Sequence, residues 1–385
     1  MIVVIADDLT GAAEIGAVGL RYGLTAEVQT EFNPVSDADL IVIDTDTRSS
    51  AASEAAAMVE CVVGQVLHSC PELLFKKVDS VLRGPVLSEL AAIRRVTGSP
   101  RLLLVPANPS LGRVVRDGHY YVADVPIHLT DFAYDPEYPA RSSDVIEMLR
   151  QDASVQVAVQ SLQGPIPNAE IVVGEAESER DLADWALRLD STTIPAGASG
   201  FFGSILESMG LRVVEPSMPD APAAAETTLF VCGSASESSQ SRISRAEARG
   251  VAVARMPRAL FDLHADPRGF IGRWSEVAKR ALVTKGEAVL TIGHKRSQAP
   301  GLPKVMSDYM SQAVRAILSD VHVDRLCIEG GSTASTLVRQ MRWNRLTVCD
   351  ERTPGVVEML IAGETSPTII TKPGSYAWDG LISDE

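Results

Sequence analysis

The first residues with chemical potential are two adjacent carboxylates, Asp7 and Asp8, which end the first apolar run of the chain. That run, residues 2–6, is short, β-branched and unalternating, which is typical of a strand buried on both faces. We expect Thr10 to cap a helix over residues 12–22. The carboxylates would then lie at the carboxyl end of a buried strand, where open α/β sheets bind ligands. The spacing equally fits one aspartate as a helix cap and the other in solvent.

Two further polar groups also follow predicted strands. Residues 76–85 read Lys-Lys-Val-Asp-Ser-Val-Leu-Arg-Gly-Pro and lie between a strand predicted over 73–78 and a helix predicted over 86–96. Residues 45–48 follow a strand predicted over 40–44. Arginine can bind a carboxylate through two hydrogen bonds, and lysine supplies a point charge. An exposed loop with a capping side chain explains either group equally well. The candidate substrate-binding residues are Asp7, Asp8, Arg48, Lys77, Asp79, Ser80 and Arg83.

Two Gly/Ser turns, residues 233–236 and 330–333, each lie between a predicted strand and a predicted helix. Bare glycine backbone and the N–H groups of a helix N-terminus suit phosphate oxygens. Neither turn is a Walker A loop or a G-x-G-x-x-G fingerprint, and each alone is commonly a helix cap. Lys372 is either a charge for a nucleotide phosphate or an ordinary surface lysine. The candidate nucleotide-binding residues are Ser234, Ser236, Gly330, Gly331, Ser332, Thr333, Lys372 and Gly374, and no metal ligand is assigned.

The elements that must position these residues alternate between strand-like and helix-like runs, which indicates βαβ units and largely parallel sheets. Residues 106–139, rich in proline and glycine, predict an irregular excursion with short strands. Residues 216–226 hold several prolines and predict a semi-rigid linker. We therefore predict an α/β protein of two domains, 1–215 and 227–385. Each would be a mostly parallel sheet flanked by helices, with the active site in the cleft between the domains.

The composition argues against several classes of protein. The net charge is −15 and Lys and Arg form no runs, so nucleic acid is not expected as a partner. No apolar stretch approaches the roughly 18 residues of a membrane-spanning helix, and no signal peptide is visible. The five cysteines include no C-x-x-C pair, which favours reduced thiols and a cytoplasmic location. We expect Cys232, Cys327 and Cys349 to be buried. The six histidines lack metal-ligand spacing.

The motifs together resemble a known family, the four-carbon acid sugar kinases, which use ATP to phosphorylate threonate, erythronate or 3-oxo-tetronate. The resemblance covers nearly the whole chain, through residues 5–12, 77–84, 106–109 with 112–113, 118, 233–236, 330–334, 354–355 and 372–374. The K-x-D-S form of the second motif is more similar to the threonate and erythronate kinases than to the 3-oxo-tetronate kinases. Val81, Pro85 and Ser332 depart from the family pattern.

The resemblance implies an ATP-dependent kinase that acts on the terminal hydroxyl of a small anionic sugar acid, with ATP and Mg²⁺ as cofactors. Arg48 and Arg83 would hold the substrate carboxylate, and Asp8 or Asp79 would accept the proton of the attacking hydroxyl. Two other classes stay open: a dehydrogenase on a similar sheet, and a non-catalytic sensor of sugar acids. A homodimer also stays open, and no membrane partner is expected.

Overall fold

A computed structural model describes residues 1–135, 137–149, 155–214, 227–234, 237–261, 266–293 and 302–372. The chain divides into two compact units, Met1–Glu215 and Pro216–Glu385. The predicted linker, residues 216–226, lies outside the described residues.

The N-terminal unit is built on a parallel sheet with the strand order β2-β3-β1-β4-β11-β5-β10-β9. Its central strands are apolar and buried on both faces, because helices cover both sides. The strands are β1 (Ile2–Ala6), β2 (Ala26–Gln29), β3 (Leu40–Asp44), β4 (Leu73–Lys77), β5 (Arg101–Val105), β9 (Val157–Gln160), β10 (Ile171–Gly174) and β11 (Thr193–Gly197).

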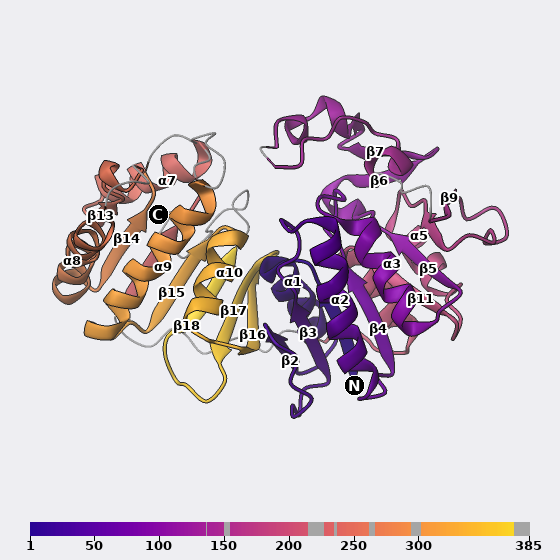
Figure 1. The fold of residues 1–385 in the computed structure, drawn as a ribbon, viewed down its shortest axis with the longest axis horizontal. Helices are drawn as coiled ribbons and strands as arrows, with labels where there is room; N and C mark the ends of the chain where they lie inside the picture. The colour runs from indigo at the N-terminus through magenta and orange to yellow at the C-terminus, as the bar shows by residue number, and fades with distance from the viewer. Residues whose placement is uncertain are drawn as a thin grey trace. The chain divides into compact units, whose positions relative to one another are not determined.

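Helices α2 and α3 pack side by side over one face of this sheet (Figure 1). Helices α1, α5 and α6 pack together over the other face, where Phe75 of β4 contacts Phe201 and Phe202 of α6. The helices are α1 (Leu9–Arg21), α2 (Ala52–Leu67), α3 (Val86–Thr97), α4 (Val145–Met148), α5 (Glu179–Ala186) and α6 (Ser199–Ser208).

The predicted excursion is present, and it contains a small antiparallel sheet, β6-β7-β8. The excursion comprises η1 (Pro109–Leu111), β6 (Arg113–Arg116), β7 (His119–Val122), β8 (Val125–Pro126), η2 (Ile127–Leu129) and η3 (Asp131–Tyr134). The carbonyl oxygen of Ser80 accepts a hydrogen bond from the buried Tyr120 of β7, so the excursion is anchored to the loop that follows β4.

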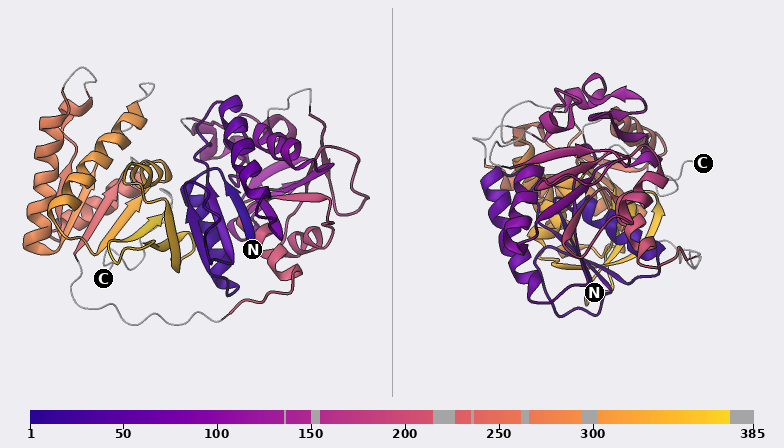
Figure 2. Two further views of the ribbon diagram at one scale, coloured as in Figure 1. Left: turned by 60° about the horizontal axis from the view of Figure 1, so that its bottom comes forward. Right: turned by 90° about the vertical axis from the view of Figure 1, so that its right-hand side faces the viewer.

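The C-terminal unit has a second sheet with the strand order β13-β14-β12-β15-β18-β17-β16. It is parallel from β13 to β18, and an antiparallel meander adds β17 and β16. The long helices α8 and α9 pack side by side, in the orange part of Figures 1 and 2. The elements are β12 (Thr228–Cys232), α7 (Glu237–Ala248), β13 (Ala252–Arg255), η4 (Arg258–Phe261), α8 (Arg268–Lys285), β14 (Glu287–Thr291), α9 (Leu302–Asp320), β15 (Arg325–Glu329), α10 (Gly331–Gln340), β16 (Arg345–Thr353), β17 (Val356–Ile361) and β18 (Thr368–Lys372).

The prediction of an α/β fold with mostly parallel sheets flanked by helices is confirmed, and two local predictions are wrong. Asp8, not Thr10, caps the first helix, which begins at Leu9. Asp8 accepts from the backbone N–H of Gly11, so the helix starts one turn earlier than predicted. Cys349 is exposed rather than buried, because it points outward from β16. Among the described helices, none has the length and apolar composition that crossing a bilayer requires.

Candidate active site

The first predicted site residues meet at the carboxyl edge of β1, where Arg48 binds both adjacent carboxylates. Its guanidinium donates from Nε and Nη2 to Asp7, at 2.7 and 3.0 Å, and from Nη1 and Nη2 to Asp8, at 2.6 and 2.9 Å. The backbone N–H groups of Thr47 and Arg48 also donate to the carbonyl of Asp7, at 3.0 and 3.1 Å. Arg48 therefore binds protein carboxylates here, and its use for a substrate carboxylate stays a prediction.

Asp8 is both the N-cap of α1 and a partner of Arg48. Its Oδ1 accepts from Gly11 N at 2.8 Å, and its Oδ2 accepts from Thr10 Oγ1 at 2.6 Å. Burial would raise the pKa of Asp8, but Arg48 and Lys77 outweigh burial and lower it. A Cβ on Gly11 would lie 2.6 Å from Asp8 Oδ1 and 3.1 Å from Lys77 Nζ. Glycine is needed at this position because the carboxylate and the ammonium approach the backbone so closely.

Asp79 and Arg83 are hydrogen-bonded to each other across a turn that follows β4. Asp79 Oδ2 accepts from the backbone N–H and the Nε of Arg83 at 3.1 and 3.0 Å, and Oδ1 accepts from Nη2 at 2.8 Å. Arg48 Nη2 lies 3.7 Å from Asp79 Oδ1, which joins this turn to the Arg48 cluster. Burial opposes ionisation of Asp79, but Arg83 and Arg48 hold its pKa far below the usual value. Ser80 Oγ accepts a hydrogen bond from Arg113, so the predicted Ser80 also lies at this edge.

Asp135, Glu137 and Tyr138 of the excursion contact the loops that carry Arg48 and Arg83. Asp135 Oδ2 accepts from Arg83 Nη1 at 3.1 Å, and Glu137 Oε2 accepts from Ser49 Oγ at 3.0 Å. Tyr138 Oη donates to the carbonyl of Arg48 at 2.7 Å. The excursion thus fixes both arginine loops. The sequence marked this region only as an irregular segment.

Lys77 points to the face of the sheet covered by α1 and α6, where it meets Glu14. Lys77 Nζ lies 3.4 Å from Glu14 Oε2 and donates to the carbonyl of Val78 at 3.1 Å. Burial alone would lower the pKa of Lys77, but Glu14 and the two aspartates outweigh burial and raise it. Glu14 Oε1 also accepts from Ser199 Oγ at 2.6 Å. Sequence reasoning missed Glu14 and Ser199 as site residues. For Glu14 a signal existed, since it lies one helical turn beyond Gly11 on the same face of α1.

Lys76, the neighbour of Lys77, points to the opposite face and pairs with Glu89 of α3. Both side chains are fully buried, and Lys76 Nζ lies 3.0 Å from Glu89 Oε2. Glu89 also accepts from Thr47 Oγ1, next to Arg48 in the chain. Burial raises the pKa of Glu89, although Lys76 opposes the shift. This pair supports the Arg48 loop from inside the core.

In the C-terminal unit, the two predicted Gly/Ser turns lie beside each other, because β12 and β15 are parallel neighbours. A Cβ on Gly233 would lie 2.0 Å from Thr333 Oγ1, so the turn after β12 packs directly against the first turn of α10. Gly330 has φ 102°, and its N–H donates to the carbonyl of Lys372 at 3.0 Å. Of the predicted nucleotide residues, Ser234, Gly331 and Ser332 also lie at this edge. Ser236 and Gly374 lie outside the described residues.

Lys372 is buried at the end of β18 rather than on the surface. Its Nζ lies 3.4 Å from Glu329 Oε1, and Arg242 of α7 donates from Nη2 to the same oxygen at 3.3 Å. Burial lowers the pKa of Lys372, although Glu329 opposes the shift. Sequence reasoning missed Glu329 and Arg242, which lie outside the glycine turns. The structure therefore brings two cations and a carboxylate to the edge where the sequence predicted phosphate binding.

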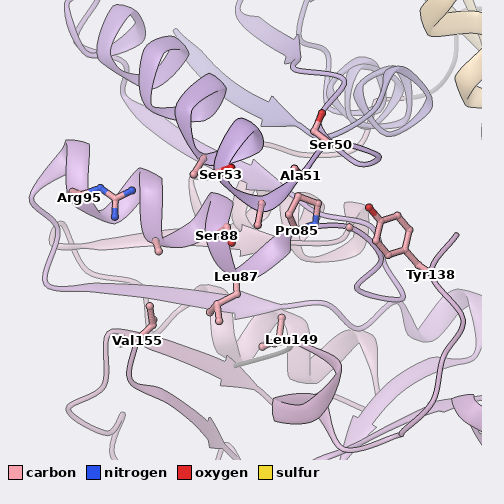
Figure 3. A pocket seen from close by; sticks show the side chains of 14 residues that line it. Ser50, Ala51, Ser53, Pro85, Leu87, Ser88, Arg95, Tyr138, Leu149 and Val155 are labelled. Carbon is pink, nitrogen blue, oxygen red and sulfur yellow. The ribbon is translucent and has the colours of Figure 1, made fainter. Parts of the chain in front are cut away.

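Two cavities adjoin the Arg83 loop. One, of about 480 Å³, lies between the first turns of α2 and α3 and is lined by Ser53, Ser88 and Tyr138 among others (Figure 3). The other, of about 550 Å³, is lined by Arg83 and Tyr138 together with apolar residues of the excursion. Arg83 lines the second of these cavities, and the first is lined by the next two residues, Gly84 and Pro85.

Comparisons with known proteins agree with this division of the chain. A family model described as a sugar-binding N-terminal domain matches residues 2–205, and one described as a nucleotide-binding C-terminal domain matches residues 229–376. A D-threonate kinase from Salmonella typhimurium LT2 is 30% identical over 267 residues, 64% of this chain and 61% of that protein. The chain belongs to the four-carbon acid sugar kinase family.

A second relative of this chain is a D-erythronate kinase from Heliobacterium modesticaldum. It is 28% identical over 56% of this chain and 50% of the relative. The chain thus spans about half to three fifths of the length of these two relatives. A crystal structure of a provisionally described tRNA synthase from Salmonella typhimurium LT2 has a TM-score of 0.77 at 16% identity, covering 98% of this chain and 96% of that one. This last likeness shows the fold alone.

Proposed function

We propose that this chain is an ATP-dependent kinase that phosphorylates the terminal hydroxyl of a four-carbon acid sugar. D-Threonate and D-erythronate are the first candidates, and the product would be the 4-phosphate. The observation that supports this most is the cluster of Asp7, Asp8, Arg48, Lys77, Asp79 and Arg83 at the carboxyl edge of the sheet that matches the sugar-binding model. 3-Oxo-tetronate is the alternative substrate.

In this proposal, the arginines and Lys77 supply the positive charge that an anionic substrate and a transferred phosphoryl group need. Phosphoryl transfer depends mainly on positioning and on charge neutralisation. Arg83 offers a cation at a cavity, and Lys77 is kept protonated by the carboxylates around it. The sequence-based assignment of Asp8 or Asp79 as base stays a prediction, as does the shared cleft between the domains.

The nucleotide would bind at the glycine turns of the C-terminal unit. This is supported by Gly233 and Gly330, which bring backbone without side chains to the same edge of the C-terminal sheet. Mg²⁺ usually keeps several waters and is bound by phosphates with one or two carboxylates. Among the described residues, no group of three or more His, Cys, Asp or Glu side chains could hold a metal ion. The carboxylate described beside these turns, Glu329, is bound by Lys372 and Arg242. We therefore assign Mg²⁺ no protein ligand.

A screen of ATP consumption tests the proposal. The purified chain is supplied with ATP, Mg²⁺ and each of D-threonate, L-threonate, D-erythronate and 3-oxo-tetronate, and the phosphorylated product is located by mass spectrometry and NMR. We expect turnover with at least one acid and loss of turnover in Arg83→Met. Binding of an acid with no ATP consumption would favour the sensor, and reduction of NAD⁺ would favour the dehydrogenase.

A further inference from the structure

We infer that Glu14, rather than Asp8 or Asp79, accepts the proton of the attacking hydroxyl. The inference rests on the proposed kinase function and concerns the same site. A general base needs a free lone pair within hydrogen-bond reach of the substrate. The contacts of the carboxylates at this edge differ sharply in that respect.

Asp8 has no acceptor capacity left for a substrate hydroxyl. Its Oδ1 accepts from Gly11 N at 2.8 Å and Arg48 Nη2 at 2.9 Å. Its Oδ2 accepts from Thr10 Oγ1 and Arg48 Nη1, both at 2.6 Å. An ionised carboxylate has about four lone-pair sites, and all four are used here. Taking up a proton would break at least one bond of the helix cap or of the arginine pair.

Asp79 is engaged in a similar way by the turn that it holds together. Its Oδ2 accepts from Val81 N at 3.3 Å and from two nitrogens of Arg83 at 3.0 and 3.1 Å. Its Oδ1 accepts from Arg83 Nη2 at 2.8 Å and lies 3.7 Å from Arg48. The Asp79 side chain is only 7% exposed. Asp79 therefore serves to orient Arg83, which is a positioning role.

Of the three carboxylates compared, Glu14 is the one that combines acceptor capacity with access to solvent. Its contacts are the Ser199 hydroxyl, at 2.6 Å from Oε1, and the Lys77 ammonium, at 3.4 Å from Oε2. Its side chain is 29% exposed, against 11% for Asp8. Lys77 Nζ connects it to the Asp8 cluster, since the ammonium and Asp8 Oδ1 both lie against Gly11. Glu14 thus faces the same edge with lone pairs still unused.

The step that this assigns to Glu14 is a single proton transfer. The primary hydroxyl oxygen of the acid sugar forms a bond to the γ-phosphorus of ATP as the bond from that phosphorus to the β,γ-bridging oxygen breaks. The electron pair of the broken bond leaves with ADP. The hydroxyl proton passes to Glu14 and then to solvent, so the products are the sugar-acid phosphate, ADP and one proton. Lys77, 3.4 Å from Glu14, would stay charged and balance the phosphoryl group.

Glu14→Gln tests the inference, with Glu207→Gln as the matched control. Glu14 of α1 accepts from Ser199 of α6, and Glu207 of α6 accepts at 2.8 Å from the hydroxyl of Tyr22, the residue that follows α1. Glutamine retains an oxygen that can accept from Ser199, so a purely structural role would survive the change. We expect kcat to fall about 100-fold or more in Glu14→Gln, with a KM for the acid within a few-fold of the parent's. The Glu207→Gln variant should keep the parental kcat.

The pH profile separates a base from a positioning group. The decline of kcat/KM on the acidic side should disappear in Glu14→Gln and persist in Glu14→Asp. The aspartate variant also provides the test if the glutamine variant does not fold. A Glu14→Gln variant with parental kcat would overturn the inference and leave the kinase function intact. No ATP consumption by the parent with any four-carbon acid would refute the proposed function, and the base role of Glu14 with it.

Discussion

Deleting the charge of Lys76 is expected to destabilise the N-terminal unit more than any surface substitution. Lys76→Met keeps a stem of similar length but removes the ammonium that lies 3.0 Å from Glu89 Oε2. Glu89 then keeps the hydrogen bond from Thr47 and has lost the opposite charge beside it. Both side chains are 0% exposed, so solvent cannot compensate the remaining carboxylate.

The expected magnitude follows from that burial. Removing one partner of a buried ion pair costs about 3–5 kcal/mol, whereas replacing both by apolar residues is often neutral. Lys76→Met should therefore lower the free energy of unfolding by about 3–5 kcal/mol. The double variant Lys76→Met/Glu89→Met should recover most of that loss, because the Thr47 hydroxyl can then donate to Thr45 Oγ1, 2.7 Å away.

The loss should also depend on pH in a defined direction. Burial raises the pKa of Glu89 above its unfolded value, so the folded chain binds this proton more tightly than the unfolded chain. Removing Lys76 takes away the charge that opposes that shift. The folded variant therefore gains stability, relative to its unfolded state, as the pH falls from 7 towards the unfolded pKa. The gap between Lys76→Met and the parent should be smaller at pH 5 than at pH 7.

Urea unfolding of the full chain, followed by circular dichroism, measures the free energies. Native-state hydrogen exchange of the α3 amides assigns the transition to the N-terminal unit. Arg95→Met is the matched control, since it breaks the exposed pair between Arg95 of α3 and Glu60 of α2 and should cost less than about 1 kcal/mol. A loss below 1 kcal/mol in Lys76→Met, or a double variant as unstable as the single one, would refute the reasoning.

Two further substitutions test the packing around the site. Gly11→Ala should lower kcat/KM at least 10-fold, because its Cβ would displace Asp8 or Lys77. The control Gly64→Ala, whose Cβ meets nothing within 4 Å in α2, should keep full activity and gain up to about 1 kcal/mol of stability. Equal activity of the two variants would contradict the close approach at α1. Tyr138→Phe removes the hydroxyl that donates to the Arg48 carbonyl and should raise the KM for the acid several-fold. Tyr134→Phe alters a side chain that is 83% exposed and should leave this KM unchanged. Steady-state kinetics with the acid varied would show whether the two tyrosines differ.

The elements that the sequence predicted best are buried strands that end in polar residues. The strand predicted over residues 40–44 has those bounds in the structure, and the strand predicted before the turn at residues 233–236 is present as β12. Each is a β-branched or aliphatic run with polar residues or glycine beyond it, so periodicity and turn chemistry agree. Of the hairpin of β16 and β17, only a strand over residues 346–349 was predicted, and β17 was missed.

The site was predictable where its residues are neighbours in sequence and not where they meet through packing. Asp7, Asp8, Asp79 and Arg83 were found because each follows a strand of the parallel sheet. The contact between Glu14 and Ser199 joins residues 185 positions apart, and local pattern carries no information about it. The same holds for the pairing of Arg242 with Glu329, which depends on how α7 covers the second sheet.

The adjacent lysines of β4 have a consequence for how this strand can tolerate insertions or deletions. Side chains alternate between the two faces of a strand, so Lys76 lies in the core beside Glu89 and Lys77 lies beside Glu14. A single-residue deletion upstream in β4 would shift the register by one residue and move Lys77 into the place of Lys76. One of the two positions would still hold a lysine, and Val78 would then occupy the other. One carboxylate would then face a hydrophobic side chain. The two adjacent lysines therefore fix the register of β4 relative to the helices on both faces of the sheet.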